Sequence, residues 1–106
     1  MLDTKMIMTR GIYRKIPADA YLEIWKWYYT MTDKRIWEGY PHCYKLSITP
    51  DGKQKIIHVE DNVKHNEERI IKLKYCKPVD EKIYVCRDKY DYDKYVDTMM
   101  LQDEYF

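Results

Sequence analysis

Apolar side chains recur at every second position in several short segments of this chain, and this period limits the possible folds more than any other feature. Tyr44, Leu46 and Ile48 share one face of such a segment, and the polar residues between them share the other. This alternation is typical of a strand with one buried face. The predicted strands cover residues 5–12, 40–49, 55–60, 69–75, 82–87 and 96–101. The last of these also fits a short helix, although a strand is favoured.

The same alternation predicts which side chains of the later strands face inward. They are Ile57 and Val59, then Ile71, Leu73 and Tyr75, then Ile83 and Val85. Turns are predicted at residues 50–52 and 78–80, where proline, aspartate and glycine favour a reversal of the chain. Gly11 predicts a bulge near the end of the first strand. The polar segment 88–95, DKYDYDKY, is predicted to be a loop.

One long helix is predicted between the first two strands. Pro17 suits its first turn, and the apolar pattern continues to about Thr32. The stripe expected to face the core consists of Ala18, Leu22, Trp25 and Tyr29. A second apolar group on the far side consists of Ile24, Trp27 and Met31. Because this arc is wider than one side of a sheet can cover, either other elements wrap the helix or the second group is an exposed patch for a partner.

These patterns together predict an α+β fold, a mostly antiparallel sheet of five to six strands with one long helix packed on it. The 106 residues give room for a single domain, residues 1–106. Twelve tyrosines and three tryptophans stand beside one phenylalanine. Tyrosine tolerates half-buried positions and is enriched at interfaces, although filling a small core and its rim also explains these rings.

Cysteine usage favours a protein of a reducing compartment. The three cysteines form no CxxC pair, and the first residues contain no long apolar region of a signal peptide. No segment approaches 18 consecutive apolar residues, so no membrane span is predicted. The expected location is therefore the cytoplasm. The net charge is +1, but residues 88–106 hold six acidic residues and two lysines, which suggests an acidic interaction segment or simply a solvated end.

No metal site, cofactor or enzymatic activity is predicted. His42 and Cys43 are adjacent and would point to opposite faces of a strand, and no second ligand pair follows at zinc spacing. Asp91 and Asp93 match only part of a calcium loop. The chain has no Gly-rich phosphate loop, GxSxG or HExxH motif. A Cys–His pair such as Cys86 with His58 stays open, because such pairs assemble in space rather than in sequence.

Binding of nucleic acid is one hypothesis for the function. Lys72 and Lys74 share one face of a predicted strand, and further basic residues cluster near the first strand. The proposed contacts are Arg10, Arg14, Lys15, Lys72, Lys74 and Lys77. Together with exposed aromatic rings, such a basic sheet face could follow phosphates and stack on bases. An ordinary solvated sheet face explains the same pattern.

Several strings occur in an order that resembles a known family. They are MTRGI at 8–12, IP at 16–17, a tryptophan at 25, KIYV at 82–85 and TMMLQDEY at 98–105. This order is similar to a small domain-of-unknown-function family of Gram-positive bacteria and their phages, and the first and last strings are the most specific. The middle departs from it, since Val59–Glu60 follows His58 where the family tends to show a Gln–Glu pair.

The resemblance implies no active site, and it implies one specific function. Mobile-element members of such families are associated with anti-CRISPR activity, the inhibition of an RNA-guided nuclease. The chain is thus expected to be a non-enzymatic inhibitor that binds a type II nuclease in the bacterial host cell. The partner-binding candidates are Ile24, Trp27, Met31, Tyr90, Asp91, Tyr92, Asp93 and Tyr95. Whether the chain also forms a homodimer through its helix stays open.

Overall fold

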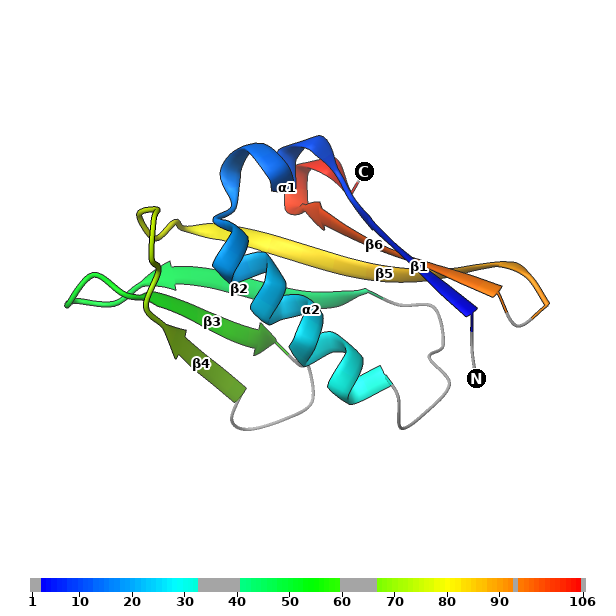
Figure 1. The fold of residues 1–106 in the computed structure, drawn as a ribbon, viewed down its shortest axis with the longest axis horizontal. Helices are drawn as coiled ribbons and strands as arrows, with labels where there is room; N and C mark the ends of the chain where they lie inside the picture. Colours follow the sequence, from blue (N-terminus) through cyan, green and yellow to red (C-terminus); the bar gives the residue numbers. More distant parts are fainter. Residues whose placement is uncertain (1–2, 33–40, 60–66, 93, 106) are drawn as a thin grey trace.

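The computed structural model describes residues 3–32, 41–59, 67–92 and 94–105 of the chain. Figure 1 shows one long helix lying across one face of a twisted sheet. The elements in chain order are β1 (Asp3–Met8), α1 (Arg10–Lys15), α2 (Ala18–Thr32), β2 (His42–Ile48), β3 (Gln54–Val59), β4 (Glu67–Ile71), β5 (Glu81–Asp91), β6 (Lys94–Leu101) and the short 3₁₀ helix η1 (Gln102–Glu104).

The six strands form one sheet in the order β1-β6-β5-β2-β3-β4. Strand β1 runs parallel to β6, and the other four neighbouring pairs are antiparallel. This confirms the predicted α+β fold with a mostly antiparallel sheet and one long helix, α2. It also confirms that the last predicted strand is a strand, β6. Gly52, with φ of 82°, occupies the predicted turn between β2 and β3 in the left-handed region that favours glycine.

The first strand is shorter than predicted, because a helical turn, α1, begins at Arg10. A carboxylate far along the chain stabilises this turn. The Glu104 carboxylate accepts hydrogen bonds from the Thr9 hydroxyl (2.6 Å), the Gly11 N–H (3.1 Å) and the Leu101 N–H (3.0 Å). Partial desolvation opposes ionisation, but these hydrogen bonds hold the pKa of Glu104 below its usual value. An acidic group at a helix N-terminus is favourable, and no local sequence pattern reveals this one.

Gly11 makes room for this carboxylate and does not form the predicted bulge. A Cβ atom on Gly11 would lie 2.5 Å from Glu104 Oε1 and 2.7 Å from Glu104 Cδ. A Cβ atom almost never lies this close to an atom to which it is not bonded. Glycine is therefore the residue that lets the two ends of the described chain meet here. The contact joins the MTRGI string to the QDEY string.

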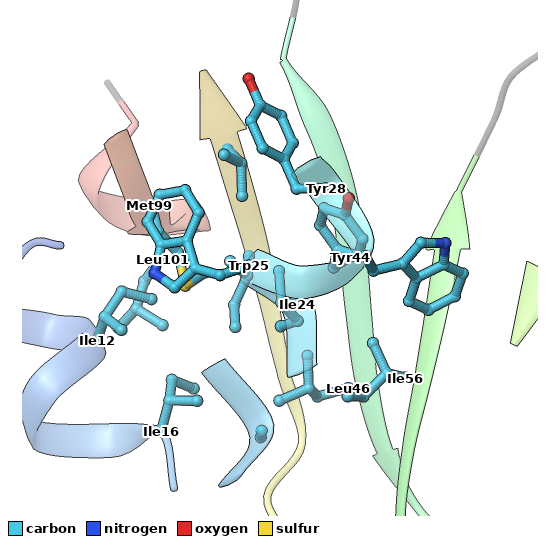
Figure 2. Close-up of a cluster of buried hydrophobic side chains, with 14 residues drawn as sticks. Ile12, Ile16, Ile24, Trp25, Tyr28, Tyr44, Leu46, Ile56, Met99 and Leu101 are labelled. Carbon is cyan, nitrogen blue, oxygen red and sulfur yellow. The ribbon is translucent and has the colours of Figure 1, made fainter. Parts of the chain in front are cut away.

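Helix α2 turns the other apolar group toward the sheet. Ile24 and Trp27 have exposed fractions of 0% and 2%, whereas Leu22 is 55% exposed and Ala18 also faces outward. The predicted core stripe is thus partly wrong, and the exposed patch of Ile24 and Trp27 is wrong. The side chain of Met31 lies outside the described residues. Figure 2 shows Ile24 pointing toward the side chains of the sheet. The helical period alone could not decide between two apolar arcs.

Strand β3 is turned by one residue relative to the prediction. Gln54, Ile56 and His58 face the helix, and Ile57 and Val59 face the opposite side. Two adjacent isoleucines leave the alternation ambiguous, and polar residues such as Gln54 and His58 are uncommon in a core. Burial is tolerated because both polar side chains have partners.

The Gln54 side chain fastens the connection between β4 and β5 to the sheet. Its amide donates to the Ser47 carbonyl (2.8 Å) and the Val79 carbonyl (2.9 Å), and its oxygen accepts from the Val79 N–H (2.8 Å). At the other end of this connection, the Lys74 N–H donates to Asp19 on α2 (3.1 Å). The connection between β4 and β5 is therefore hydrogen-bonded to α2 near its start and to the sheet near its end.

The later strands differ from the prediction in length. Strand β4 ends at Ile71, so Tyr75 lies in the connection and is 92% exposed instead of facing inward. Ile83 and Val85 are buried as predicted. Strands β5 and β6 extend into the predicted loop 88–95, β5 as far as Asp91 and β6 from Lys94, because Asp88 and Lys89 pair with β6. Cross-strand pairing here outweighs the low strand propensity of the aspartates.

The register of β3 can be tested with its two isoleucines. Ile56→Ala removes a fully buried side chain and should lower the free energy of unfolding by about 3 kcal/mol. Ile57→Ala, on the half-buried opposite face, should lower it by only about 1 kcal/mol. Urea unfolding followed by circular dichroism measures both. The reverse order of the two losses would contradict the register.

The contact between Gly11 and Glu104 predicts coupling between the two residues. Gly11→Ala should lower the free energy of unfolding by about 1 kcal/mol, because the new methyl group displaces the capping carboxylate. In a Glu104→Ala background the same substitution should be stabilising by about 0.5 kcal/mol, since alanine is favoured over glycine in a helix. A double-mutant cycle measured by urea unfolding gives both values. The same sign in both backgrounds would exclude the contact.

Candidate functional site

The β5–β6 hairpin carries the aromatic segment that the sequence singled out. In the described part of the chain, β2 pairs with β5 only from Glu81 to Val85, so the second half of β5 continues past β2 (Figure 1). The hairpin tip, defined here as Tyr90, Asp91 and Tyr92, lies at its end. Tyr90 is 48% exposed and Tyr92 is 80% exposed. Strand β5 therefore carries Tyr90 and Asp91 where the sequence predicted a loop, and Tyr92 follows directly in the turn.

Local contacts hold the residues of the hairpin tip. The Asp91 carboxylate accepts from the Tyr92 N–H at 2.8 Å. The Lys5 ammonium lies 5.4 Å from the centre of the Tyr90 ring, and the Lys89 ammonium lies 5.6 Å from that of Tyr92. These are cation–π distances, which restrain the rings without burying them. The exposed surface of the hairpin tip is therefore mainly aromatic, with acidic and basic groups beside the rings.

The structure brings together only part of the predicted partner-binding set. Tyr90, Asp91 and Tyr92 lie together and exposed, and Asp93 lies outside the described residues. Tyr95 pairs with Lys89 near the end of the hairpin but is buried, with its ring centre 5.5 Å from the Arg87 guanidinium. Tyr95, like Ile24 and Trp27 on α2, is therefore excluded from an exposed site. The alternation along β6 turns Tyr95 toward the core side, which a loop prediction could not anticipate.

A buried polar cluster fixes the base of this hairpin to α2. The Arg87 guanidinium donates two hydrogen bonds to the Asp97 carboxylate, from Nε at 2.7 Å and from its terminal nitrogen at 2.9 Å. The same carboxylate accepts from the Tyr28 hydroxyl at 3.2 Å and the Tyr29 hydroxyl at 2.7 Å. Such pairing and hydrogen bonding offset the cost of burying both charges.

The ionisation states of the cluster are fixed near neutral pH. Burial, together with the negative charge of Asp97, raises the pKa of Tyr28 and Tyr29 above the usual tyrosine range. Hydrogen bonds to Asp97 raise the pKa of Arg87 in spite of its desolvation. These groups therefore keep one charge state over the neutral range. Their hydrogen bonds join the hairpin to α2.

Among the described residues, the predicted candidates Cys86 and His58 do not lie together. His42 and His58 lie under α2, with His42 Nδ1 3.0 Å from His58 Nε2. Cys86 faces the opposite side of the sheet from His58, which excludes the pairing that the sequence left open. Burial, with a smaller effect of Asp88, raises the pKa of the Cys86 thiol to about 11. Among the residues that the structure describes, no group of three or more His, Cys, Asp or Glu could hold a metal ion.

The predicted basic sheet face does not form. Lys72, Lys74 and Lys77 lie in the connection that follows β4, because that strand ends at Ile71. The other three residues of this set, Arg10, Arg14 and Lys15, lie on α1. The six residues therefore occupy two separate elements and share no strand face. An early end of the edge strand explains the difference.

The outward side of α2 is open. Leu22, Trp25 and Tyr29, which the sequence assigned to the core, line a hollow of about 660 Å³ together with Met6 of β1. The Trp25 and Tyr29 rings stack with their centres 5.7 Å apart. Charged side chains of the same helix surround this apolar floor. Only part of the predicted stripe faces away from the sheet: Leu22 is exposed, whereas Trp25 is buried in the core as predicted and Tyr29 reaches Asp97 of β6.

Comparisons of the chain with models of protein families, with curated proteins and with solved structures found no match. No helix in the described ranges is long and apolar enough to cross a membrane. Function therefore has to be inferred from the chemistry of the surfaces themselves.

The buried phenol of Tyr28 predicts a loss of stability in alkali. Its pKa is raised in the folded protein, so the unfolded chain loses this proton first, near pH 10. The free energy of unfolding should be fully retained below about pH 10 and fall as the pH rises further. Tyr28→Phe should make that fall less steep, as measured by urea unfolding between about pH 9 and 11. Tyr75→Phe, at an exposed ring, controls for loss of a hydroxyl. Equal slopes for wild type and Tyr28→Phe would contradict the burial of this phenol.

Proposed function

We propose that this chain is a protein-binding inhibitor without catalytic turnover, and that its target is a type II RNA-guided nuclease in the bacterial host of a phage or mobile element. The observation that carries the proposal is the supported, exposed hairpin tip of Tyr90, Asp91 and Tyr92. The choice of a nuclease comes from the resemblance of the terminal strings to a family with anti-CRISPR associations. The place of action is then the host cytoplasm.

The geometry of the hairpin tip suits a protein anchor. Tyrosine supplies a large contact area with few rotatable bonds, and it is among the residues that dominate binding energy in interfaces. Because Tyr90 lies in β5 and a lysine ammonium lies at cation–π distance from each ring, less conformational freedom remains to be lost on binding. Preorganised aromatic side chains of this kind bind a partner at a lower entropic cost than flexible ones.

The charge of the hairpin tip suits a basic groove. A type II nuclease reads its short duplex motif with arginines in a groove that also carries polyanion. Asp91 can offer one carboxylate to such a groove, and the flanking rings can cover the stems of its arginine side chains. Charge complementarity of this kind mainly accelerates association, whereas the rings slow dissociation. The inhibitor would therefore compete with DNA without any reaction of its own.

The proposal is tested by cleavage of target DNA by a purified type II nuclease loaded with guide RNA. Stoichiometric excess of the protein should abolish cleavage, and the complex should survive gel filtration. Tyr90→Ala combined with Tyr92→Ala should weaken inhibition by roughly 30-fold or more, the cost of losing one strong anchor. Asp91→Asn should slow association and reduce its dependence on salt.

Tyr75→Ala provides the matched control, because it removes an even more exposed tyrosine from the connection between β4 and β5. It should inhibit like the wild type. Full cleavage by several divergent nucleases would overturn the choice of target. Inhibition that survives the double tyrosine substitution would instead overturn the role of the hairpin tip.

A further inference from the structure

One face of the sheet is not covered by the described helices. The buried side chains of α1 and α2 join the core on one side, with strand residues such as Tyr44, Leu46 and Ile83. Their strand neighbours project from the opposite side, which we name the open face. Across its middle, Met100, Tyr84, Cys43 and Val59 stand in one cross-strand row on β6, β5, β2 and β3. These side chains are only half-buried.

Two lysines stand side by side on the open face. Lys45 of β2 is directly opposite Lys82 of β5 in the antiparallel register. Directly opposed residues have Cβ atoms roughly 5 Å apart, and like charges in such pairs are destabilising. Within the described residues neither lysine has an ion-pair partner, whereas Lys55 on the same face lies 3.1 Å from Glu68. An anion placed between Lys45 and Lys82 would offset their repulsion.

Two tyrosine rings stand beside this lysine pair. Tyr84 follows Lys82 by two residues on β5, so both project from the open face about 7 Å apart along the strand. The Tyr105 ring packs against Tyr84 with 5.0 Å between ring centres and 36° between planes. Tyr105 is itself partly exposed. The open face thus holds an aromatic surface next to an unneutralised pair of cations.

We propose that the open face binds single-stranded nucleic acid, with a phosphate between Lys45 and Lys82 and a neighbouring base on the Tyr84–Tyr105 pair. Flat sheets that combine aromatic rings with lysines bind single strands because every base has a face to stack and every nucleotide a charge to pair. In a duplex the base faces are stacked on each other, so a duplex can use only the lysines. The site is distinct from the hairpin tip and does not depend on the proposed inhibition.

A second copy of the chain fits the open face less well. A twofold contact places the same patch of both copies together. Two such faces would bring a second lysine pair close to the first and increase the repulsion that the single chain already carries. The charge of the open face therefore selects an anionic partner over a copy of itself.

The proposal is tested by fluorescence anisotropy with labelled pyrimidine oligonucleotides of about 12 nucleotides, which spans a typical single-strand site. RNA and DNA strands of the same sequence form two arms, and a duplex forms the third. At least one single strand should bind more tightly than the duplex, with affinity that falls as salt rises. Lys45→Ala combined with Lys82→Ala should weaken binding about tenfold and reduce the salt slope by about one to two.

Two further variants separate stacking from charge. Tyr84→Leu keeps an apolar side chain and should weaken binding about tenfold with an unchanged salt slope. Lys72→Ala combined with Lys74→Ala removes the same charge away from the open face and should leave affinity within about twofold. The Tyr90→Ala and Tyr92→Ala protein should still bind, which keeps this proposal separate from the inhibitor proposal.

The proposal is overturned if no single strand binds at about 100 μM, a concentration at which even non-specific electrostatic binding is usually seen. It is also overturned if single strand and duplex bind equally, or if the two double-lysine variants lose the same affinity. A dimer in gel filtration that the Tyr84→Leu substitution dissociates would assign the open face to a second copy instead. Thermal unfolding of each variant confirms that its fold is retained.

Discussion

The pairing of Arg87 with Asp97 is the interaction on which the other features depend. It joins β5 to β6 through two hydrogen bonds and ties both strands to α2 through the hydroxyls of Tyr28 and Tyr29. A buried ion pair adds little net stability over a well-packed apolar pair, but loss of one member leaves an uncompensated charge at a cost of about 3–5 kcal/mol. The hydrogen bonds from Tyr28 and Tyr29 to Asp97 hold α2 in one rotation, and that rotation decides which of its apolar side chains are buried.

The period of the sequence predicted the architecture well and the orientation of its parts poorly. Alternation located the strands, and Pro17 with the apolar pattern located α2. The rotation of α2 could not be predicted, because both arcs are apolar and the choice depends on partners such as Asp97, distant in sequence. The register of β3 failed for a similar reason. Gln54 and His58 are polar, and hydrogen-bond partners that are distant along the chain, such as Val79 for Gln54, make their burial tolerable.

The candidate sites follow the same division. Tyr90, Asp91 and Tyr92 were visible in the sequence because an aromatic and acidic cluster is a local feature. Lys45 and Lys82 were not visible as a pair, since only the register of β2 with β5 places them side by side. Local chemistry can therefore be read along a chain, whereas a surface assembled across strands depends on the pairing of the sheet. This protein presents one candidate of each kind.

The position of β1 has a consequence for biosynthesis. Strand β1 has a single neighbour in the sheet, β6, and the Glu104 carboxylate that supports α1 contacts a hydroxyl 95 residues away along the chain. While the chain emerges from the ribosome, β1 has no sheet neighbour among the described strands until β6 has been synthesised. Contacts of such long sequence separation close slowly, because the intervening chain must first be ordered. Strands β2 to β5 and α2 can therefore assemble first, and β1 is the element that joins the sheet last, once β6 is in place.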